Sequence, residues 1–186
     1  MDPALRPLWP GMRVVGRAMT VQVEESAEIP PEPYDGEMSA LDALRPGDVA
    51  VYAIPPGSRA AAWGELFTCG AQGLGAIGAV IDGAIRDATQ IGELGFPVFC
   101  RSRSPLDTLG RAVAVGHGMP VVCGGVEVHL DDVVVADEDG VVVIPRDLAT
   151  AVATAVGEKR ALEDAARADL LSGMGVRAVW AKYGVF

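Results

Sequence analysis

The 186-residue sequence is poor in cysteine, in aromatic residues and in positive charge. Its three cysteines, Cys69, Cys100 and Cys123, are widely spaced without a C-x-x-C pair, which argues against a disulfide framework or a zinc site. We expect them to be reduced thiols in the core. Fifteen basic residues stand against 25 acidic ones, and the net charge of −10 argues against a nucleic-acid-binding surface.

The sequence also lacks an apolar run long enough to cross a bilayer, and its N-terminus has no signal-peptide pattern. We therefore expect a cytoplasmic protein with no membrane partner. Half of the residues are hydrophobic and 22% are charged, an ordinary balance for a folded protein. This length predicts one mixed α/β domain over residues 1–186, with a C-terminal helical segment over residues 146–186.

Apolar periodicity divides the chain into short elements. Proline-rich residues 1–11 are expected on the surface, and residues 102–118 as a loop or a weak strand. Alternating or continuous apolar residues predict strands over 12–23, with a bulge at Gly16, and over 48–54, 77–81 and within 119–145. Helical spacing predicts helices over 38–44, 64–72, 86–94 and 148–171, and a final packed segment over 176–183.

The stretch from Trp63 to Asp87 holds the candidate site. Glu65 lies in the first turn of one predicted helix and Arg86-Asp87 in the first turn of the next, with twenty residues between Glu65 and Arg86. A helix, a turn and a strand carry the chain out and back, so both helix starts are expected at one edge of a sheet. Helix-start amides favour an anion, whereas two carboxylates favour a hard cation. These residues predict a site for a small anionic substrate held on a divalent metal.

Two other interpretations compete with this one. Acidic first-turn residues are common, so Glu65 and Asp87 could serve the helix dipole alone, with Arg86 as an ion-pair partner. The place of Arg86 directly after a glycine-bounded apolar strand favours a functional role, because α/β sheets bind ligands at the carboxyl ends of their strands. The glycines of Gly73-x-Gly75-x-x-Gly78 match a dinucleotide fingerprint by letters. In this sequence a predicted helix precedes the glycines and a predicted strand follows them, whereas the fingerprint requires a strand before the glycines and a helix after them.

Several segments together resemble the family of class II 4-hydroxy-4-methyl-2-oxoglutarate aldolases and RraA-like ribonuclease regulators. The central matches are Gly64-Glu-Leu66, Gly78-Ala-Val-Ile-Asp-Gly-Ala-Ile-Arg-Asp87 and Gly95-Phe-Pro-Val-Phe99. Supporting matches are Val15–Val21, Arg45–Val49, Val121–Val126 and Asp137–Pro145. The resemblance implies a single domain with a layered α/β/β swivelling-type fold, assembled as a homotrimer or hexamer.

The resemblance also implies roles for individual residues. Asp87 would ligate Mg²⁺ or Mn²⁺, Glu65 would hold a metal-bound water, and both would be catalytic together with Arg86. The substrate-binding residues would be Arg86, Gly64, Glu65, Leu66 and Phe67. In the aldolases an acid from the neighbouring subunit's C-terminal helix completes the metal site, and the candidates are Glu158, Glu163 and Asp164.

The implied activity is that of a metal-dependent aldolase, a carbon–carbon lyase. It would cleave a 4-hydroxy-2-oxo acid to pyruvate through a metal-stabilised enolate, with oxaloacetate decarboxylase side activity. The only lysines, Lys159 and Lys182, lie in the C-terminal helical part, so no Schiff-base lysine is apparent. The alternative is a non-catalytic RraA-like regulator that binds a ribonuclease or helicase. Such a docking protein would not need the set Glu65, Arg86 and Asp87.

Overall fold

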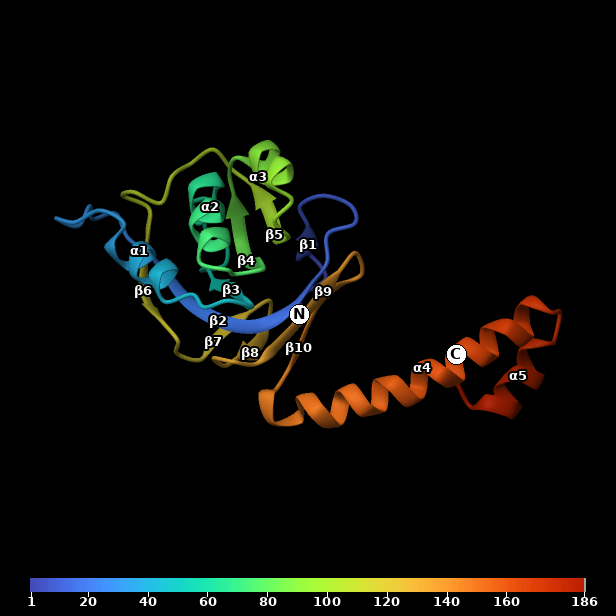
Figure 1. Ribbon diagram of the computed structural model, residues 1–186. Coiled ribbons are helices and arrows are strands. Elements are labelled where there is room, and N and C mark those ends of the chain that lie inside the picture. Colours follow the sequence, from blue (N-terminus) through green and yellow to red (C-terminus); the bar gives the residue numbers. More distant parts are fainter. Residues whose placement is uncertain (186) are drawn as a thin grey trace. The chain divides into compact units, whose positions relative to one another are not determined.

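The structure, a computed structural model, describes residues 1–185 and divides the chain into two compact units (Figure 1). The first unit is Met1–Arg146, and the second begins at Asp147. The last residue of the predicted segment 146–186 lies outside the described residues.

The first unit is built from an eight-stranded sheet, a two-stranded hairpin and helices α1 to α3. The strands of the sheet are β1 (Arg6–Pro7), β2 (Val14–Glu25), β3 (Asp48–Ala53), β4 (Gly78–Ile85), β5 (Val98–Arg103), β6 (Ala112–His117), β9 (Val133–Asp137) and β10 (Gly140–Ile144). The hairpin pairs β7 (Val121–Cys123) with β8 (Val126–Val128). The helices are α1 (Asp35–Asp42), α2 (Glu65–Gly73) and α3 (Ala88–Leu94).

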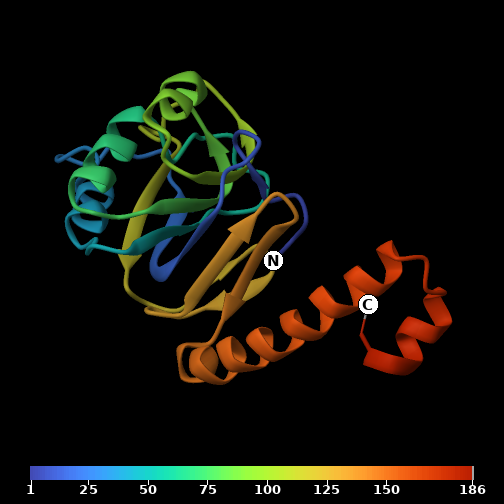
Figure 2. The same ribbon diagram turned by 45° about the vertical axis from the view of Figure 1, so that its right-hand side comes forward.

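The long strand β2 joins the two halves of this sheet. The order of strands is β1-β5-β4-β3-β2-β9-β10, and β6 also pairs with β2. Strands β2 to β5 run parallel to one another, whereas β1, β6 and β9 are antiparallel to their partners. β2 pairs with β3 along one side, and on its other side with β9 at its start and β6 at its end (Figure 2).

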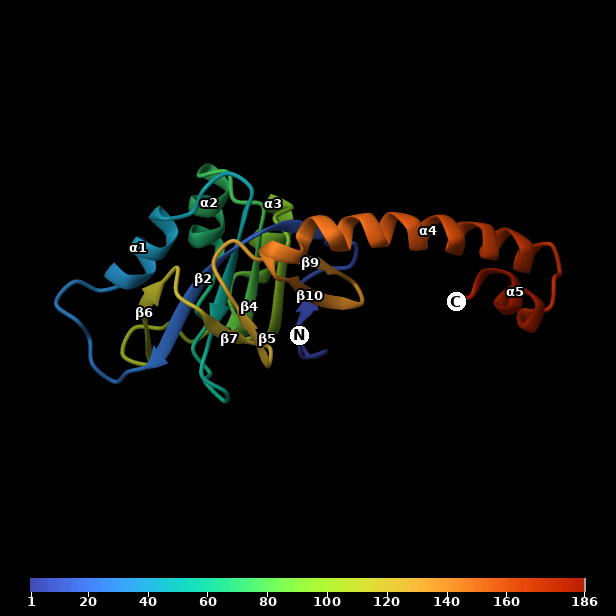
Figure 3. The same cartoon turned by 90° about the horizontal axis from the view of Figure 1, so that it is seen from below.

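The parallel strands are covered on both faces, which explains why they are almost continuously apolar. One core cluster lies between the strands and helices α1 to α3, and the helices are seen on that face in Figure 3. A second cluster joins the other face to β7, β8, β9 and β10. All six residues of β3 are buried as a result. The layers are therefore helix, sheet and hairpin, in the order α/β/β.

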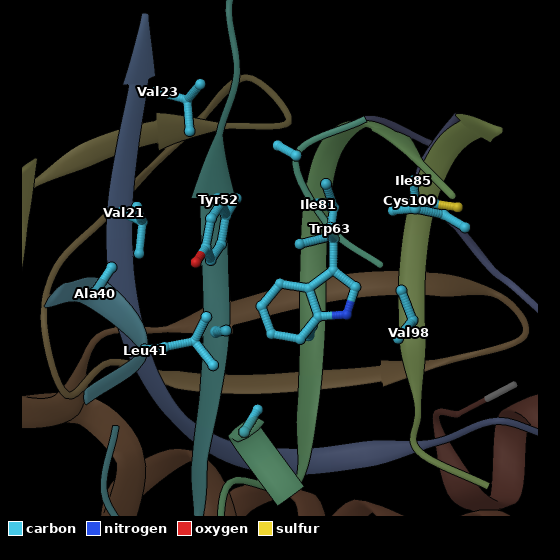
Figure 4. Packing of buried hydrophobic residues seen from close by; sticks show 14 of the residues in the cluster. Val21, Val23, Ala40, Leu41, Tyr52, Trp63, Ile81, Ile85, Val98 and Cys100 are labelled. Atoms are coloured by element: carbon cyan, nitrogen blue, oxygen red, sulfur yellow. The ribbon is translucent and has the colours of Figure 1, made fainter. Parts of the chain in front are cut away.

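Trp63 is the largest side chain in the helix-side core and is fully buried (Figure 4). Its ring meets those of Tyr52 and Phe67 edge-on, at centroid distances of 5.4 and 6.0 Å, and lies nearly parallel to Phe96 at 6.4 Å. Its Nε1–H donates to Thr68 Oγ1 at 2.8 Å. Because only Gly64 separates Trp63 from α2, this packing fixes where the helix begins.

The predicted bulge at Gly16 is wrong. Gly16 pairs regularly with Val134, and the irregular step of β2 lies between Gln22 and Val23, opposite β6. Glycine is needed at position 16 for a different reason: a Cβ there would lie 2.7 Å from the carbonyl oxygen of Gly47.

Two further predictions need correction. The proline-rich N-terminal segment is not confined to the surface, because Leu5 and Leu8 are buried and β1 extends the sheet beside β5. Cys100 and Cys123 are core thiols as predicted, and burial raises their pKa to about 11 and about 12. Cys69, however, is exposed on α2.

The second unit is a helical hairpin of α4 (Ala149–Leu171) and α5 (Val176–Tyr183). Ala166 of α4 and Val179 of α5 are buried. Asp169 accepts hydrogen bonds from Lys182 Nζ at 2.7 Å and from the Tyr183 hydroxyl at 2.8 Å. In the part of the chain that the structure describes, no helix combines the length and apolarity that a membrane crossing requires.

The Trp63–Thr68 contact predicts the effect of Thr68→Val. The substitution leaves the buried indole N–H without its acceptor and removes the Thr68 hydroxyl from the Gly64 carbonyl, 2.9 Å away. We expect the free energy of unfolding in urea to fall by about 1–3 kcal/mol. Thr154→Val is the matched control, because Thr154 makes the same bond to the carbonyl four residues earlier on an exposed helix face. It should change stability by less than about 0.5 kcal/mol. Equal losses in the two variants would contradict the prediction.

Candidate functional site

The two predicted helix starts lie at the same edge of the sheet, beyond the carboxyl ends of β3 and β4. The segment before α2 runs beside the end of β4, where Arg86 N–H donates to the Trp63 carbonyl at 2.9 Å. Across this contact, Glu65 N–H donates to Asp87 Oδ2 at 3.1 Å. Parallel strands with connecting helices bring their carboxyl ends together, and ligands bind at such edges.

The sequence predicts Asp87 in the first turn of α3, but Asp87 occupies the N-cap position before that turn, without a side-chain capping hydrogen bond. Its backbone is left-handed, with φ of 57°, which a side chain such as aspartate tolerates better than most. Its carboxylate is 39% exposed. A Cβ on Gly64 would lie 2.7 Å from Asp87 Oδ2, so glycine at position 64 leaves room for this carboxylate beside α2.

Arg86 is held by contacts along its guanidinium and still keeps 31% of its side chain exposed. Nη1 donates to the Ala61 carbonyl at 3.0 Å, and Nε lies 3.7 Å from Asp87 Oδ2. Nη2 lies 3.5 Å from Asp107 Oδ2. A guanidinium has five N–H donors in one plane, so these contacts leave donors that can bind another anion.

The start of α2 supplies further donors for an anion. The N–H of Glu65 is taken by Asp87, whereas those of Leu66 and Phe67 belong to the first helical turn, whose amides have no partner within the helix. The Leu66 side chain is 80% exposed, and Phe67 packs on Trp63. The backbone of 64–67 can therefore face a ligand.

The carboxylates of the site suit one kind of metal better than another. Within residues 1–185, no three His, Cys, Asp or Glu side chains gather as a metal site would require. Zinc, which is held by four protein ligands or by three with one open position, does not fit this set. Mg²⁺ keeps several waters and uses one or two carboxylates, so Asp87 with Glu65 beside it fits such an ion.

Asp107 and Tyr34 are site residues that the sequence analysis missed. Asp107 comes from the loop after β5, and it accepts a hydrogen bond from the Tyr34 hydroxyl at 3.1 Å while it faces Arg86. Neither residue belongs to a motif, and they are 73 positions apart. No local pattern in the sequence therefore signals that they meet.

Glu37 is a buried carboxyl next to this group. It is only 2% exposed, and its Oε2 has no hydrogen-bond partner among residues 1–185. Burial raises the pKa of Glu37, and the charge of Asp107 adds to the effect. The site thus combines an exposed Arg–Asp pair with a buried, poorly solvated acid.

Known proteins resemble this chain in sequence and in fold. Residues 1–143 match the family described as RraA-like: Aldolase/RraA. A protein of Halalkalibacterium halodurans named "Putative 4-hydroxy-4-methyl-2-oxoglutarate aldolase" is 34% identical over 183 residues, which cover 96% of this chain and 82% of that protein.

Solved structures agree with this match. An uncharacterized protein from Pseudomonas syringae pv. tomato has a TM-score of 0.86 and 28% identity, covering 97% of this chain and 81% of that one. Streptomyces coelicolor RraAS2, described as an unusual member of the RNase ES inhibitor RraA protein family, has a TM-score of 0.79 and 29% identity, covering 88% and 80% of the two chains. The layered α/β/β fold predicted from the resemblance is confirmed.

The burial of Glu37 predicts how stability depends on pH. An acid whose pKa is raised by folding stabilises the protein below its unfolded pKa, about 4.3 for glutamate, and loses that contribution as pH rises through its folded pKa. Glu37→Gln removes the charge, so it should raise the melting temperature at pH 8 by about 2–4 °C, as 1 kcal/mol would in a chain of this size.

The difference between Glu37→Gln and the parent protein should shrink towards pH 4, where both carry a neutral side chain. Glu93→Gln, on the exposed face of α3, is the control and should show no such trend. A constant difference between pH 4 and pH 8, measured by thermal unfolding, would show that Glu37 does not titrate abnormally.

Proposed function

The chain belongs to the RraA-like, Aldolase/RraA family, and on that premise we propose that it is a divalent-metal-dependent lyase that cleaves a 4-hydroxy-2-oxo acid to pyruvate. The observation that carries this proposal is the gathering of the Arg86 guanidinium, the Asp87 carboxylate and the first-turn amides of α2 at one sheet edge. Guanidinium and amides suit a carboxylate substrate, and the carboxylates suit a hard cation.

In this proposal Arg86 binds the carboxylate of the 2-oxo acid. Its Nη1 is fixed on the Ala61 carbonyl, so the remaining donors have a defined direction. A planar guanidinium matches a carboxylate by two parallel hydrogen bonds, which orients the substrate as well as binding it. The amides of Leu66 and Phe67 would donate to the same anionic group from the start of α2.

Asp87 would hold Mg²⁺ or Mn²⁺, and Glu65 would hold a water next to it. A divalent cation bound there supplies a Lewis acid that offsets the negative charge of the pyruvate enolate left by carbon–carbon cleavage. Glu65 is half-exposed at the same helix start, and we propose that the water it would hold takes up the proton that the 4-hydroxyl releases. Loss of CO₂ from oxaloacetate leaves the same enolate, so decarboxylase activity should accompany aldolase activity.

The distribution of lysines supports a metal-dependent reaction. An imine-forming aldolase needs a lysine in its site. Both lysines of the sequence, Lys159 and Lys182, form ion pairs in the second unit, with Glu163 at 3.4 Å and with Asp169 at 2.7 Å, which do not suit the free amine that imine formation needs. A homotrimer or hexamer is part of the proposal, with an acid of a neighbouring α4 completing the site. Exposed apolar residues of α4, among them Val156 and Leu162, are consistent with such an assembly.

The second candidate function is that of an RraA-like regulator of a ribonuclease or helicase. It is favoured by the likeness to RraAS2 of Streptomyces coelicolor. A docking surface, however, would need neither the close fit of Gly64 against Asp87 nor the contacts that orient Arg86.

The first prediction of this proposal is pyruvate release from oxaloacetate with Mg²⁺ or Mn²⁺. We expect turnover to disappear with EDTA and to fall at least about 100-fold in Asp87→Ala, because changes even to residues outside the ligand shell of a metal cost 10–100-fold. Asp42→Ala, an exposed aspartate on α1, is the matched control and should keep full activity. A metal-replete protein that converts neither oxaloacetate nor 4-carboxy-4-hydroxy-2-oxoadipate would favour the regulator.

The second prediction concerns the glycine beside Asp87. In Gly64→Ala the new Cβ would lie 2.7 Å from Asp87 Oδ2 and 3.0 Å from Arg86 Cγ, so both side chains must move. We expect activity to fall about 10- to 100-fold with little loss of stability, since displacing reacting groups by about 1 Å has such effects. Gly73→Ala in the same helix has open space around its Cβ and should keep activity. Kinetics and urea unfolding of both variants test this, and an active Gly64→Ala would place the reacting groups elsewhere.

A further inference from the structure

We propose that Asp107 is a positioning residue for Arg86, and that Tyr34 holds Asp107 in place. The contact between Tyr34 and Asp107 would thereby set the direction in which Arg86 presents its free donors to a substrate carboxylate. The part of this inference that concerns substrate rests on the function proposed above, whereas the contacts themselves do not.

The two oxygens of Asp107 have separate partners. Oδ2 faces Arg86 Nη2 at 3.5 Å. Oδ1 accepts the Tyr34 hydroxyl at 3.1 Å, the Leu109 N–H at 2.9 Å and the Thr108 hydroxyl at 3.4 Å. The carboxylate plane is therefore fixed by hydrogen bonds to one oxygen, and the other oxygen is left for the guanidinium.

Asp107 adds a second contact at the outer end of the Arg86 guanidinium, which the Ala61 carbonyl holds at one nitrogen only. The Ala61 carbonyl holds Nη1, and Asp87 lies 3.7 Å from Nε. If Asp87 binds a cation, its attraction for Arg86 weakens. Asp107 is then the carboxylate that keeps the guanidinium in its plane. Neighbouring carboxylates of this kind orient ligating and catalytic side chains without themselves binding the ligand.

The backbone conformation of Tyr34 indicates that surrounding contacts hold this residue in place. Its φ is 65°, a left-handed conformation that bulky residues rarely adopt, and its side chain caps no amide of α1 in the described structure. Among residues 1–185, the non-glycine residues with positive φ are Tyr34, Asp87 and Asp131. Asp87 lies 3.7 Å from Arg86, and Tyr34 is joined to Arg86 through Asp107. Strained residues persist where the surroundings hold them, and they are frequent at functional sites.

The charges of the group agree with this arrangement. Burial opposes ionisation of Asp107, but the Leu109 and Tyr34 hydrogen bonds and the Arg86 charge outweigh it and lower the pKa of Asp107. Burial, together with the bond to Asp107, raises the pKa of Tyr34. At neutral pH Tyr34 is thus a neutral hydroxyl, Asp107 a carboxylate and Arg86 a guanidinium, and these are the charge states in which the described contacts form.

The test compares Asp107→Asn and Tyr34→Phe with the parent protein. Asparagine keeps an oxygen for Tyr34 and Leu109 but loses the charge that faces Arg86, whereas phenylalanine removes only the hydroxyl. Tyr183→Phe is the matched control, because Tyr183 makes the same kind of bond to Asp169, at 2.8 Å, in the other unit.

The first measurement does not depend on activity. In ¹⁵N NMR spectra the Arg86 Nε–H signal, identified by its absence in Arg86→Lys, should exchange with water at least about threefold faster in both test variants and at the parent rate in Tyr183→Phe. An unchanged exchange rate in Asp107→Asn would overturn the proposal.

The second measurement is steady-state kinetics with oxaloacetate. Arg86 binds the carboxylate equally in the ground state and in the transition state, so mispositioning should raise KM with a smaller change in kcat. We expect KM to rise about 10-fold in Asp107→Asn and about 3-fold in Tyr34→Phe. A loss of kcat in both variants with unchanged KM would mean that the two residues are merely structural, and it would also overturn the proposal. If the parent protein releases no pyruvate, the proposed function fails, and the exchange rates alone decide about Asp107.

Discussion

Burial of both faces of the parallel strands β2 to β5 is the constraint on which the rest of this structure depends. Helices α1 to α3 cover one face, and the β7–β8 and β9–β10 hairpins cover the other. Parallel strands need a crossover after each strand, so the helices that cover the sheet all start at the same edge. The candidate site lies at that edge because the same connections that complete the core also deliver its residues.

The charged groups of the first unit fall into two kinds: those whose partners all lie within the unit, and those that keep exposed donors or acceptors. Asp48 at the start of β3 is completely buried and is satisfied by Arg17 at 3.0 Å and Arg45 at 3.2 Å. Asp82 of β4 pairs with Arg101 and accepts the N–H of Gly124 at 2.6 Å, which ties the hairpin to the sheet. These carboxylates have their partners within the unit. Arg86 and Asp87 remain partly exposed, and their contacts leave donors and acceptors for a ligand.

Local charge at this edge matters more than the charge of the whole chain. A net charge of −10 would repel an anionic substrate at long range. At contact distance, Arg86 and the first-turn amides of α2 dominate, and a cation on Asp87 would add to them. An acidic protein can therefore bind an acidic substrate, provided that its few cations are directed by neighbouring groups. Asp107 and Tyr34 are the neighbours that the structure provides for Arg86.

The sequence by itself determined most of the elements and, through the resemblance, the fold family, and it brought Glu65, Arg86 and Asp87 together as candidate site residues. Apolar periodicity and glycine or proline breaks are local properties, and these residues lie within one continuous stretch. Only the tertiary structure decided that Leu5 and Leu8 are buried, that Asp87 takes a left-handed cap and that Tyr34 and Asp107 meet beside Arg86. Such contacts arise from the packing of segments far apart in the chain. No periodicity or short motif encodes which loop residues will meet once the helices and hairpins pack on the sheet.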